Sequence, residues 1–203
     1  MKTNKNPSFK QEKLLWKKGL EKIVGLDEVG RGAFAGPLVA AAVILPKKFK
    51  INGIKDSKLL TPAKRQVLSE YIIKNSVAYS ISKVNLSFIN KYGVGKATHQ
   101  AFRNCLKNID FDFVLVDGYQ IKNYDKRLQK GIIHGDNISV SIAAASIIAK
   151  VYRDNLMKKL HKQFPEYNFL KNKGYGTKYH REALKKHGLC KLHRTSFNLQ
   201  KFL

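Results

Sequence analysis

Two apolar segments joined by only eight residues constrain the fold of this chain more than any other feature. Residues 21–29, EKIVGLDEV, and residues 38–46, LVAAAVILP, have the apolar and β-branched content of buried strands. The connecting sequence, GRGAFAGP, is rich in glycine and too short to hold a crossover helix, and Pro46 ends the second segment. The pattern therefore predicts an antiparallel pair of strands.

The rest of the chain alternates between helical and strand-like patterns. Thr61 and Pro62 are typical of a helix start, as an N-cap residue and a first-turn proline. We expect helices over 61–75, 86–107 and 138–164, and strands over 77–84, 111–119 and 131–136. Antiparallel strands followed by β-α units indicate a mixed sheet covered by helices, an α/β fold.

Charge is the most unusual property of the composition. The 203 residues include 39 Lys and Arg against 14 Asp and Glu, which gives a formal net charge of +25. Such a field favours a polyanion, meaning nucleic acid or an anionic membrane. A lysine-rich composition shared by all proteins of the source is the alternative explanation.

A membrane partner is not expected, because the longest apolar runs are far too short to span a bilayer. The first 20 residues lack the apolar core and cleavage site of a signal peptide, and two cysteines give no disulfide framework, so we expect a cytoplasmic protein. The apolar residues near the N-terminus are Phe9, Leu14, Leu15, Trp16 and Leu20. They could form a basic amphipathic helix, although packing of this segment onto the domain is the preferred interpretation.

Four carboxylates follow the ends of predicted strands, each near a glycine: Asp27, Glu28, Asp117 and Asp136. Any one of them alone is explained by the capping of a turn. Neighbouring strand ends in a mixed sheet can bring them together, however, and uncompensated carboxylates at short range repel. Mg²⁺ or Mn²⁺ resolves that repulsion, and a pair of such ions clamps the two oxygens of a phosphodiester displacement. We therefore interpret the set as a metal site that cuts the polyanion.

Six motifs occur in order between residue 23 and about residue 197. They are GLDEVGRGAFAGP (25–37), DSKLLT (56–61), LVDGY (115–119), HGDNISVSIAAASIIAKVYRD (134–154), NKGYGTKYH (172–180) and HRTSF (193–197). Together they closely resemble the type 2 ribonucleases H, ribonuclease HII. The related ribonuclease HIII usually carries an extra N-terminal domain and lacks the arginine of the glycine element, so the HII type is the better match.

The resemblance implies a ribonuclease H-like mixed sheet with flanking helices and a C-terminal helical region. The expected organisation is a basic N-terminal segment over 1–22, a catalytic domain over 23–160, and a helical and basic region over 161–203 packed on it. The implied activity is cleavage of RNA in RNA/DNA hybrids, and cleavage 5′ to single ribonucleotides in duplex DNA, leaving 3′-hydroxyl and 5′-phosphate ends. We expect a monomer whose replication or repair partners the sequence does not identify.

The same resemblance implies roles for individual residues. Asp27, Glu28, Asp117 and Asp136 become the metal-binding and catalytic carboxylates. Gly30, Arg31 and Gly32 correspond to the element that reads the 2′-hydroxyl at the junction of ribose and deoxyribose. Tyr175 corresponds to the tyrosine that stacks on the adjacent sugar. Glycine permits the close backbone approach that such reading needs, and a 2′-hydroxyl is what distinguishes RNA from DNA.

Further contacts to phosphate or sugar are expected from Lys58, Lys150, Arg194 and Ser196, for which structural roles are equally compatible with the sequence. His134 suits either a proton shuttle or a turn. Asp154 suits either a contact with the active site or an ion pair with Arg153 or Lys158. The sequence departs from the family pattern at Ala33-Phe34, Leu59 and Tyr119, and none of these is a carboxylate.

Four other interpretations fit parts of the sequence. The glycine turn resembles a dinucleotide-binding loop with one residue too many, and a zinc site would use side chains of irregular spacing: His180, His187, Cys190 and His193. A non-catalytic module for hybrids or double-stranded RNA would need only the basic surface. A general metal-dependent DNA nuclease would use the carboxylates without the ribose-reading residues.

Overall fold

Five strands form one mixed sheet in the order β3-β2-β1-β4-β5. The structure is a computed structural model, and it describes residues 6–50, 53–54 and 61–203. Three strands are antiparallel neighbours: β1 (Ile23–Val29), β2 (Leu38–Ile44) and β3 (Ala78–Val84). Two more continue the sheet parallel to β1: β4 (Phe113–Asp117) and β5 (Gln129–Ile132). The predicted antiparallel pair and mixed sheet are confirmed.

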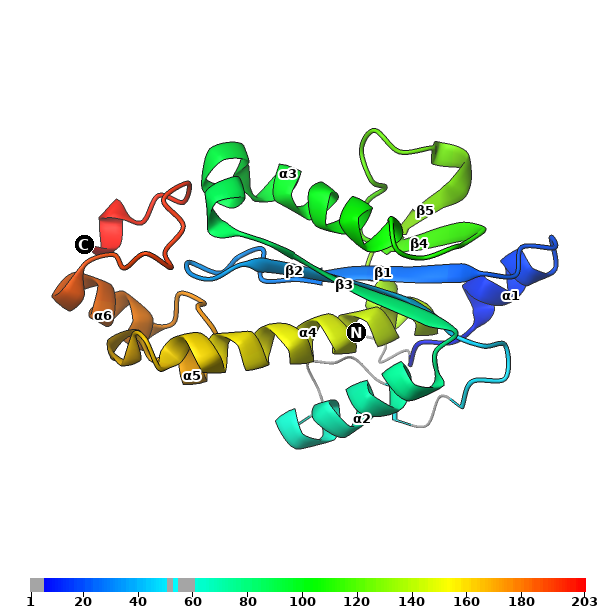
Figure 1. Cartoon of the computed structure of the whole chain (residues 1–203), viewed down its shortest axis with the longest axis horizontal. Helices are drawn as coiled ribbons and strands as arrows, with labels where there is room; N and C mark the ends of the chain where they lie inside the picture. Colours follow the sequence, from blue (N-terminus) through cyan, green and yellow to red (C-terminus); the bar gives the residue numbers. More distant parts are fainter. Residues whose placement is uncertain (1–5, 51–52, 55–60) are drawn as a thin grey trace, which may run out of the picture.

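Helices cover both faces of this sheet (Figure 1). On one face lies α3 (Leu86–Leu106), and on the other lie α4 (Val140–His161) and α2 (Pro62–Asn75). Because β2 is buried on both sides, its side chains alternate between the two cores: Leu38, Ala40, Ala42 and Ile44 face α3, whereas Val39, Ala41 and Val43 face α4. Burial on both faces explains why the sequence of β2 is a continuous apolar run.

The start of α4 lies directly against the central strand. A Cβ atom added at Gly25 would lie 2.0 Å from the carbonyl carbon of Ser141, so only glycine permits this approach. The Ser139 hydroxyl caps α4 by accepting from the N–H of Ile142. The first turn of α4 is thereby fixed beside β1, whose last residues include two of the candidate carboxylates.

Most element boundaries agree with the predictions to within three residues, and the two larger differences are local. The strand predicted over 131–136 ends at Ile132, because His134 takes a left-handed conformation with φ of 54° and residues 135–137 form the 3₁₀ helix η3 (Gly135–Asn137). The helix predicted over 86–107 is kinked at Gly93, where φ is 81° and ψ is 160°. The predicted cap of α2 is confirmed, since the Thr61 hydroxyl accepts from the N–H of Lys64.

The N-terminal segment packs on the domain, as preferred from the sequence. Its helix is α1 (Lys10–Trp16), and the rings of Phe9 and Trp16 lie 5.4 Å apart against the core, whereas Leu14 is exposed. The segment is anchored by the buried Glu12, which no sequence pattern indicated and whose carboxylate accepts from the Ser139 hydroxyl and the N–H of Ser141. In the described part of the chain, no helix is both long and apolar enough to cross a membrane.

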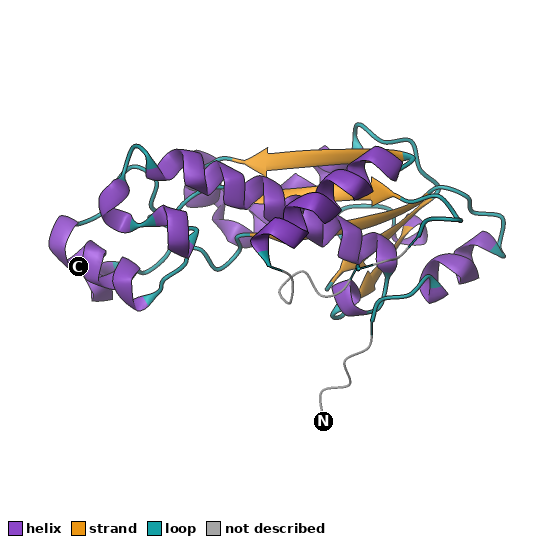
Figure 2. Ribbon diagram, turned by 90° about the horizontal axis from the view of Figure 1, so that it is seen from below, coloured by secondary structure: helices purple, strands orange, loops and turns teal. Residues whose placement is uncertain are grey.

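Short helices form the C-terminal region at one end of the sheet (Figure 2). These are η4 (Pro165–Tyr167), α5 (Phe169–Asn172), α6 (Lys178–His187) and η5 (Gln200–Phe202). Their core also contains Ala35, from the connection between β1 and β2, and Met157, from α4. The second half of the glycine-rich connection is therefore packed between the sheet domain and this region.

Candidate active site

The four predicted carboxylates line a single cavity of about 360 Å³. Two of them, Asp27 and Asp117, lie at the ends of adjacent parallel strands, where the register pairs Leu26 with Val116 one residue earlier. The cavity is completed by the glycine-rich connection, the first half of α4 and the C-terminal region: Val29, Gly30, Arg31, Gly32, Ser146, Lys150 and Tyr175. The fold thus brings together most of the residues that the sequence singled out.

Each carboxylate is held by a neighbour. Asp27 accepts from the backbone N–H of Glu28 at 2.6 Å, and a hydrogen bond from Ser146 also favours its ionised form. Asp117 accepts from the N–H of Gly135 at 2.7 Å, which ties β4 to η3. Asp136, inside η3, accepts from the Asn137 amide at 3.0 Å. Ser146 was missed by the sequence analysis, because a serine among the small residues of α4 gives no signal of its own.

The cluster carries negative charge that its surroundings compensate only in part. Burial, followed by the charges of Glu28 and Asp117, raises the pKa of Asp27 well above its ordinary value. Burial and the charge of Asp117 raise the pKa of Glu28 to about 7, against the opposing effect of Arg31. Arg31 lies 3.5 Å from a Glu28 carboxylate oxygen, and its side chain is 57% exposed at the rim of the cavity. Mutual repulsion is therefore a property of this site.

The donor set suits a hard divalent cation. Carboxylate oxygens are the ligands that Mg²⁺ and Mn²⁺ prefer, and a cation would relieve the repulsion that raises these pKa values. Within the described ranges, no three His, Cys, Asp or Glu side chains already stand as a metal-ligand set. The carboxylates fit a metal in chemistry and location, and their side chains would have to turn toward one another to share it.

Backbone geometry explains the glycines beside the carboxylates. Gly30 has φ of 94°, and a Cβ atom added to it would lie 2.3 Å from Nε of Arg153. Gly32 is different, because an added Cβ would meet nothing within 4 Å, so the backbone there borders open space. Gly30 is required by packing behind the connection, whereas Gly32 leaves room on the side of the cavity.

Arg194 is not a surface contact for phosphate, which corrects the sequence interpretation. Its side chain is fully buried, and its guanidinium donates to the carbonyl of Gly36 at 2.9 and 3.0 Å and to the carbonyl of Arg31 at 2.8 Å. Burial lowers its pKa to about 10. Arg194 therefore holds the glycine-rich connection from behind instead of facing the cavity.

Arg153, on α4, also holds the glycine-rich connection from behind. The sequence had suggested only an ion pair for it. It donates to the carbonyls of Pro37 at 3.0 Å, Ala35 at 3.2 Å and Lys173 at 2.9 Å. Its guanidinium also lies 5.3 Å from the ring centroid of Tyr175. The available signal was the position of this arginine on the helix that begins with the small and apolar run SIAAASIIA (141–149), since an arginine that faces a core is buried only when its donors are satisfied.

Tyr175 reaches the cavity because the C-terminal region pairs with the connection. Ala33 forms an isolated antiparallel bridge with Tyr175, and Ala35 forms one with His193. Beneath them, Nε2 of His180 and Nε2 of His193 lie 3.0 Å apart, and Nδ1 of His180 contacts the Tyr175 carbonyl at 2.9 Å. Burial and the charge of His180 lower the pKa of His193 to about 4, so both rings are neutral near pH 7. These two histidines are placed as a hydrogen-bonded pair.

The remaining candidates lie outside the cavity or have other partners. The backbone N–H of Ser196 donates to the Asn90 amide on α3 at 3.5 Å, and Lys58 lies outside the described residues. Asp154 forms ion pairs with Lys150 at 2.7 Å and with Arg65 at 3.8 Å, not with the partners expected from the sequence. His134 occupies a turn. The glycine-rich connection leads into β2 and not into a helix, which contradicts the dinucleotide-loop interpretation.

Comparison with known proteins agrees with this architecture. A family profile described as Ribonuclease HII matches residues 24–200. A ribonuclease HII of Caldicellulosiruptor bescii is 48% identical over 191 residues, covering 93% of this chain and 92% of the relative. One from Wolbachia pipientis subsp. Culex pipiens is 48% identical over 197 residues, covering 95% and 96%.

Solved structures give the same result. The ribonuclease H2 of Pyrococcus horikoshii OT3 superposes with a TM-score of 0.74 at 25% identity, covering 89% of this chain and 96% of the other. The fold also matches Bst-RNase HIII, solved in complex with Mn²⁺, with a TM-score of 0.71 at 19% identity over 90% of this chain and 68% of the other.

Proposed function

The chain belongs to the ribonuclease HII family, and we propose that it hydrolyses its substrates by a two-metal-ion mechanism and also cuts 5′ to single ribonucleotides in duplex DNA. Membership itself makes the protein a divalent-metal-dependent endonuclease of the ribonuclease H class, acting on RNA/DNA hybrids. The finer proposal concerns which bond is cut, by which residues, and with which ions.

The observation that carries the proposal is the position of four carboxylates in one cavity, beside a backbone segment held by two buried arginines. Asp27, Glu28, Asp117 and Asp136 would hold Mg²⁺ or Mn²⁺. Bound there, the ions would activate a water for in-line attack and stabilise the 3′-oxygen that leaves, which gives 3′-hydroxyl and 5′-phosphate ends. By fixing where the metal is held, the same carboxylates would also set the position of the scissile phosphate.

Recognition of ribose is assigned to the rim of the same cavity. Gly30, Arg31 and Gly32 would read the 2′-hydroxyl through the backbone, which the open space at Gly32 permits. Arg31 is exposed and can face a phosphate with two parallel hydrogen bonds. Tyr175, which also lines the cavity and pairs with Ala33 of the glycine-rich connection, would stack on the neighbouring deoxyribose. We further propose that the enzyme acts as a monomer in the cytoplasm.

Cleavage of a duplex with one embedded ribonucleotide tests the proposal. Three substrates are compared with Mn²⁺ and with Mg²⁺: this duplex, an RNA/DNA hybrid and an all-DNA duplex. Expected is a single cut 5′ to the ribonucleotide, with no cut in the all-DNA control. A protein that cuts the hybrid but leaves the embedded ribonucleotide intact would refute the finer specificity, and a cut in all three would indicate a general nuclease.

Substitution of the carboxylates tests their role. Asp27→Asn and Asp117→Asn should each lower kcat at least about a hundredfold, since removing charge-stabilising groups costs about two to three orders of magnitude, while substrate binding is kept. Asp110→Asn is the matched control, because Asp110 is exposed and its ion-pair partner among the described residues is Lys22. Near-normal rates in either cavity variant would refute the assignment. Binding without any cutting by the unaltered protein would favour the non-catalytic module.

A further inference from the structure

The exposed side of α3 is basic and aromatic over its whole length. No Asp or Glu occurs between Glu70 and Asp110 in the sequence. We define the α3 surface as the cationic and aromatic side chains that line two adjoining cavities here: Lys83, Phe88, Lys91, Tyr92, Lys96, His99, Arg103 and Lys122. Among the ion pairs formed by described residues, none includes a lysine or arginine of this surface. Its positive charge is therefore left for a partner.

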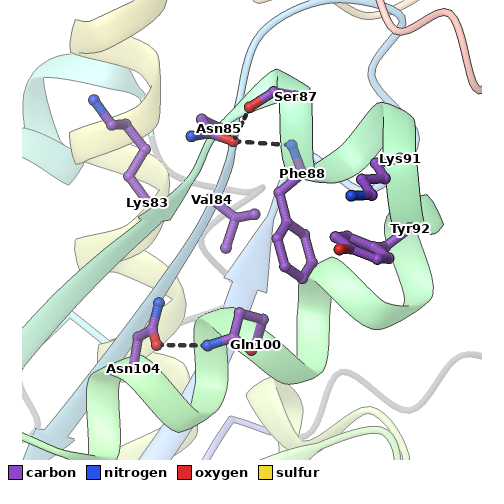
Figure 3. Close-up of a pocket in the computed structure, with 9 residues that line it drawn as sticks. All are labelled: Lys83, Val84, Asn85, Ser87, Phe88, Lys91, Tyr92, Gln100 and Asn104. Carbon is purple, nitrogen blue, oxygen red and sulfur yellow. Dashed lines mark hydrogen bonds between the residues drawn. The ribbon is translucent and has the colours of Figure 1, made fainter.

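An aromatic pair separates the two cavities. The rings of Phe88 and Tyr92 lie 4.6 Å apart, and Tyr92 is 42% exposed. On one side is a cavity of about 600 Å³ whose floor carries the hydrogen-bonded amides of Gln100 and Asn104 (Figure 3). On the other is a cavity of about 650 Å³. Hollows lined by cations, amides and an aromatic ring suit phosphates and sugars better than an apolar ligand.

The kink in α3 shapes this surface. Gly93 leaves the helical conformation, so Lys91 and Tyr92 stand at a corner and not in line with the following turns. Nζ of Lys91 and Nζ of Lys96 lie 5.2 and 5.9 Å from the Tyr92 ring centroid, one from each side of the kink. A single exposed ring flanked by two ammonium groups results.

The surface adjoins the candidate active site. In the C-terminal region, the Arg194 guanidinium donates at 2.8 Å to the carbonyl of Arg31, the arginine at the rim of the cavity. Asn90, in the first part of α3, accepts from the N–H of Ser196 in the C-terminal region. From residue 94 to residue 103 the helix is about 14 Å long, which corresponds to about four nucleotides of one strand.

We propose that the α3 surface binds the sugar–phosphate backbone of the duplex that flanks the cut, extending the site by about four nucleotides beyond the cavity. This inference rests on the proposed function, because it places the scissile nucleotide in the carboxylate cavity. The surface increases affinity and fixes the position of the duplex but takes no part in the chemical step. Its loss therefore weakens substrate binding without lowering the rate of cleavage in the enzyme–substrate complex.

Steady-state kinetics of matched double variants test this inference. Lys91→Gln/Lys96→Gln removes two exposed charges, Lys91→Arg/Lys96→Arg keeps them, and Lys64→Gln/Lys74→Gln removes two charges from α2 on the opposite face of the sheet. The substrates are an RNA/DNA hybrid and the duplex with one ribonucleotide, measured between 50 and 200 mM KCl. These lysines are exposed, so the variants should fold, which circular dichroism checks.

For the α3 glutamine variant, we expect KM to rise about tenfold or more at 100 mM salt while kcat stays unchanged. The slope of log(kcat/KM) against log salt should become shallower by about 2, because each lost phosphate contact removes about 0.9 from it. The arginine variant should behave like the unaltered protein. Equal KM and slope for the α3 and α2 glutamine variants would overturn the inference. Failure of the unaltered protein to cut at the embedded ribonucleotide would instead refute the proposed specificity. In that case, KM and the salt slope measured on the RNA/DNA hybrid would still test the role of the α3 surface.

Discussion

At the scale of single residues, the function of this site follows from the conflict between its carboxylates. Asp27 and Glu28 are buried beside Asp117, and both pKa values are raised, so the fold retains an arrangement that costs stability when the groups ionise. A cation that binds the ionised carboxylates removes that cost. Metal binding and the stability of the protein are therefore coupled through pH.

The pH dependence of metal stabilisation is the corresponding prediction. Glu28 has a pKa of about 7 in the folded protein against an ordinary value of 4.5, so between these pH values the folded state binds more protons than the unfolded state. The metal-free protein should thus lose stability as pH rises from about 4.5 to 7. Mn²⁺ at about a hundred times its Kd should add about 2.7 kcal/mol at pH 8 and much less at pH 5.

Thermal unfolding with and without Mn²⁺ at several pH values measures this effect, and Glu28→Gln provides the comparison. The variant should show a flatter pH profile without metal and a smaller metal shift at pH 8. Equal metal shifts at pH 5 and pH 8 in the unaltered protein would contradict the proposed coupling.

Sequence patterns located the carboxylates but could not distinguish exposed from buried arginines. Asp27 and Asp117 are predictable, because acidic groups beside glycines at strand ends are a local pattern. Arg194 was assigned to substrate, and Arg153 was given no role in the site, because their partners are carbonyls far away in the sequence. An arginine whose hydrogen-bond acceptors are backbone carbonyls far away in the sequence is not marked by any local sequence pattern.

At the scale of elements, the two arginines make the glycine-rich connection part of a rigid layer. Arg153 links the carbonyls of Ala35 and Pro37 to that of Lys173, and Arg194 links those of Arg31 and Gly36. No isolated loop of this composition would hold one conformation. Under the proposed function, positions that read a 2′-hydroxyl must be held to within a fraction of an ångström, so we expect this support to contribute to specificity.

Arg153→Lys should therefore impair ribose recognition as well as stability. A lysine cannot reach three carbonyls, so acceptors remain buried without donors, and we expect a loss of about 2–4 kcal/mol in unfolding free energy. Cleavage at a single ribonucleotide should fall more than cleavage of a long hybrid, which offers several sites. Arg127→Lys is the control, because Arg127 is exposed and, in the part of the chain that the structure describes, forms its ion pair with the nearby Asp125. Equal losses on both substrates would indicate a purely structural role.

Boundaries of elements depended on backbone conformations that composition does not specify. The strand expected over 131–136 stops at Ile132 because His134 adopts a left-handed conformation, and this turn carries Asp136 back toward β4. The Gly93 kink was equally hidden inside a helical pattern. The fold class, by contrast, followed from periodicity and the length of connections, which are local properties.

At the scale of the whole molecule, the C-terminal region contributes to the candidate active site. The predicted boundary at residue 160 stays a prediction, yet the core of this region includes Ala35 and Met157 from the other side of that boundary. The His180–His193 pair contacts the carbonyl of Tyr175, which places an aromatic ring in the cavity. We propose that 23–160 and 161–203 unfold together.

Leu184→Ala tests that cooperativity. Leu184 is fully buried in the C-terminal core, and its truncation should cost about 2–5 kcal/mol, with the protein unfolding in one calorimetric transition of lower midpoint. Ala101→Gly is the reference substitution, because Ala101 on α3 belongs to the core between that helix and the sheet. Both variants should move the same transition. Because Phe34 and Ala35 of the glycine-rich connection share the core of Leu184, and the neighbouring Ala33 pairs with Tyr175, only Leu184→Ala should also raise KM for ribonucleotide-containing duplex at 25 °C. Two separate transitions, of which Leu184→Ala moves only one, would show that the C-terminal region folds as an independent unit.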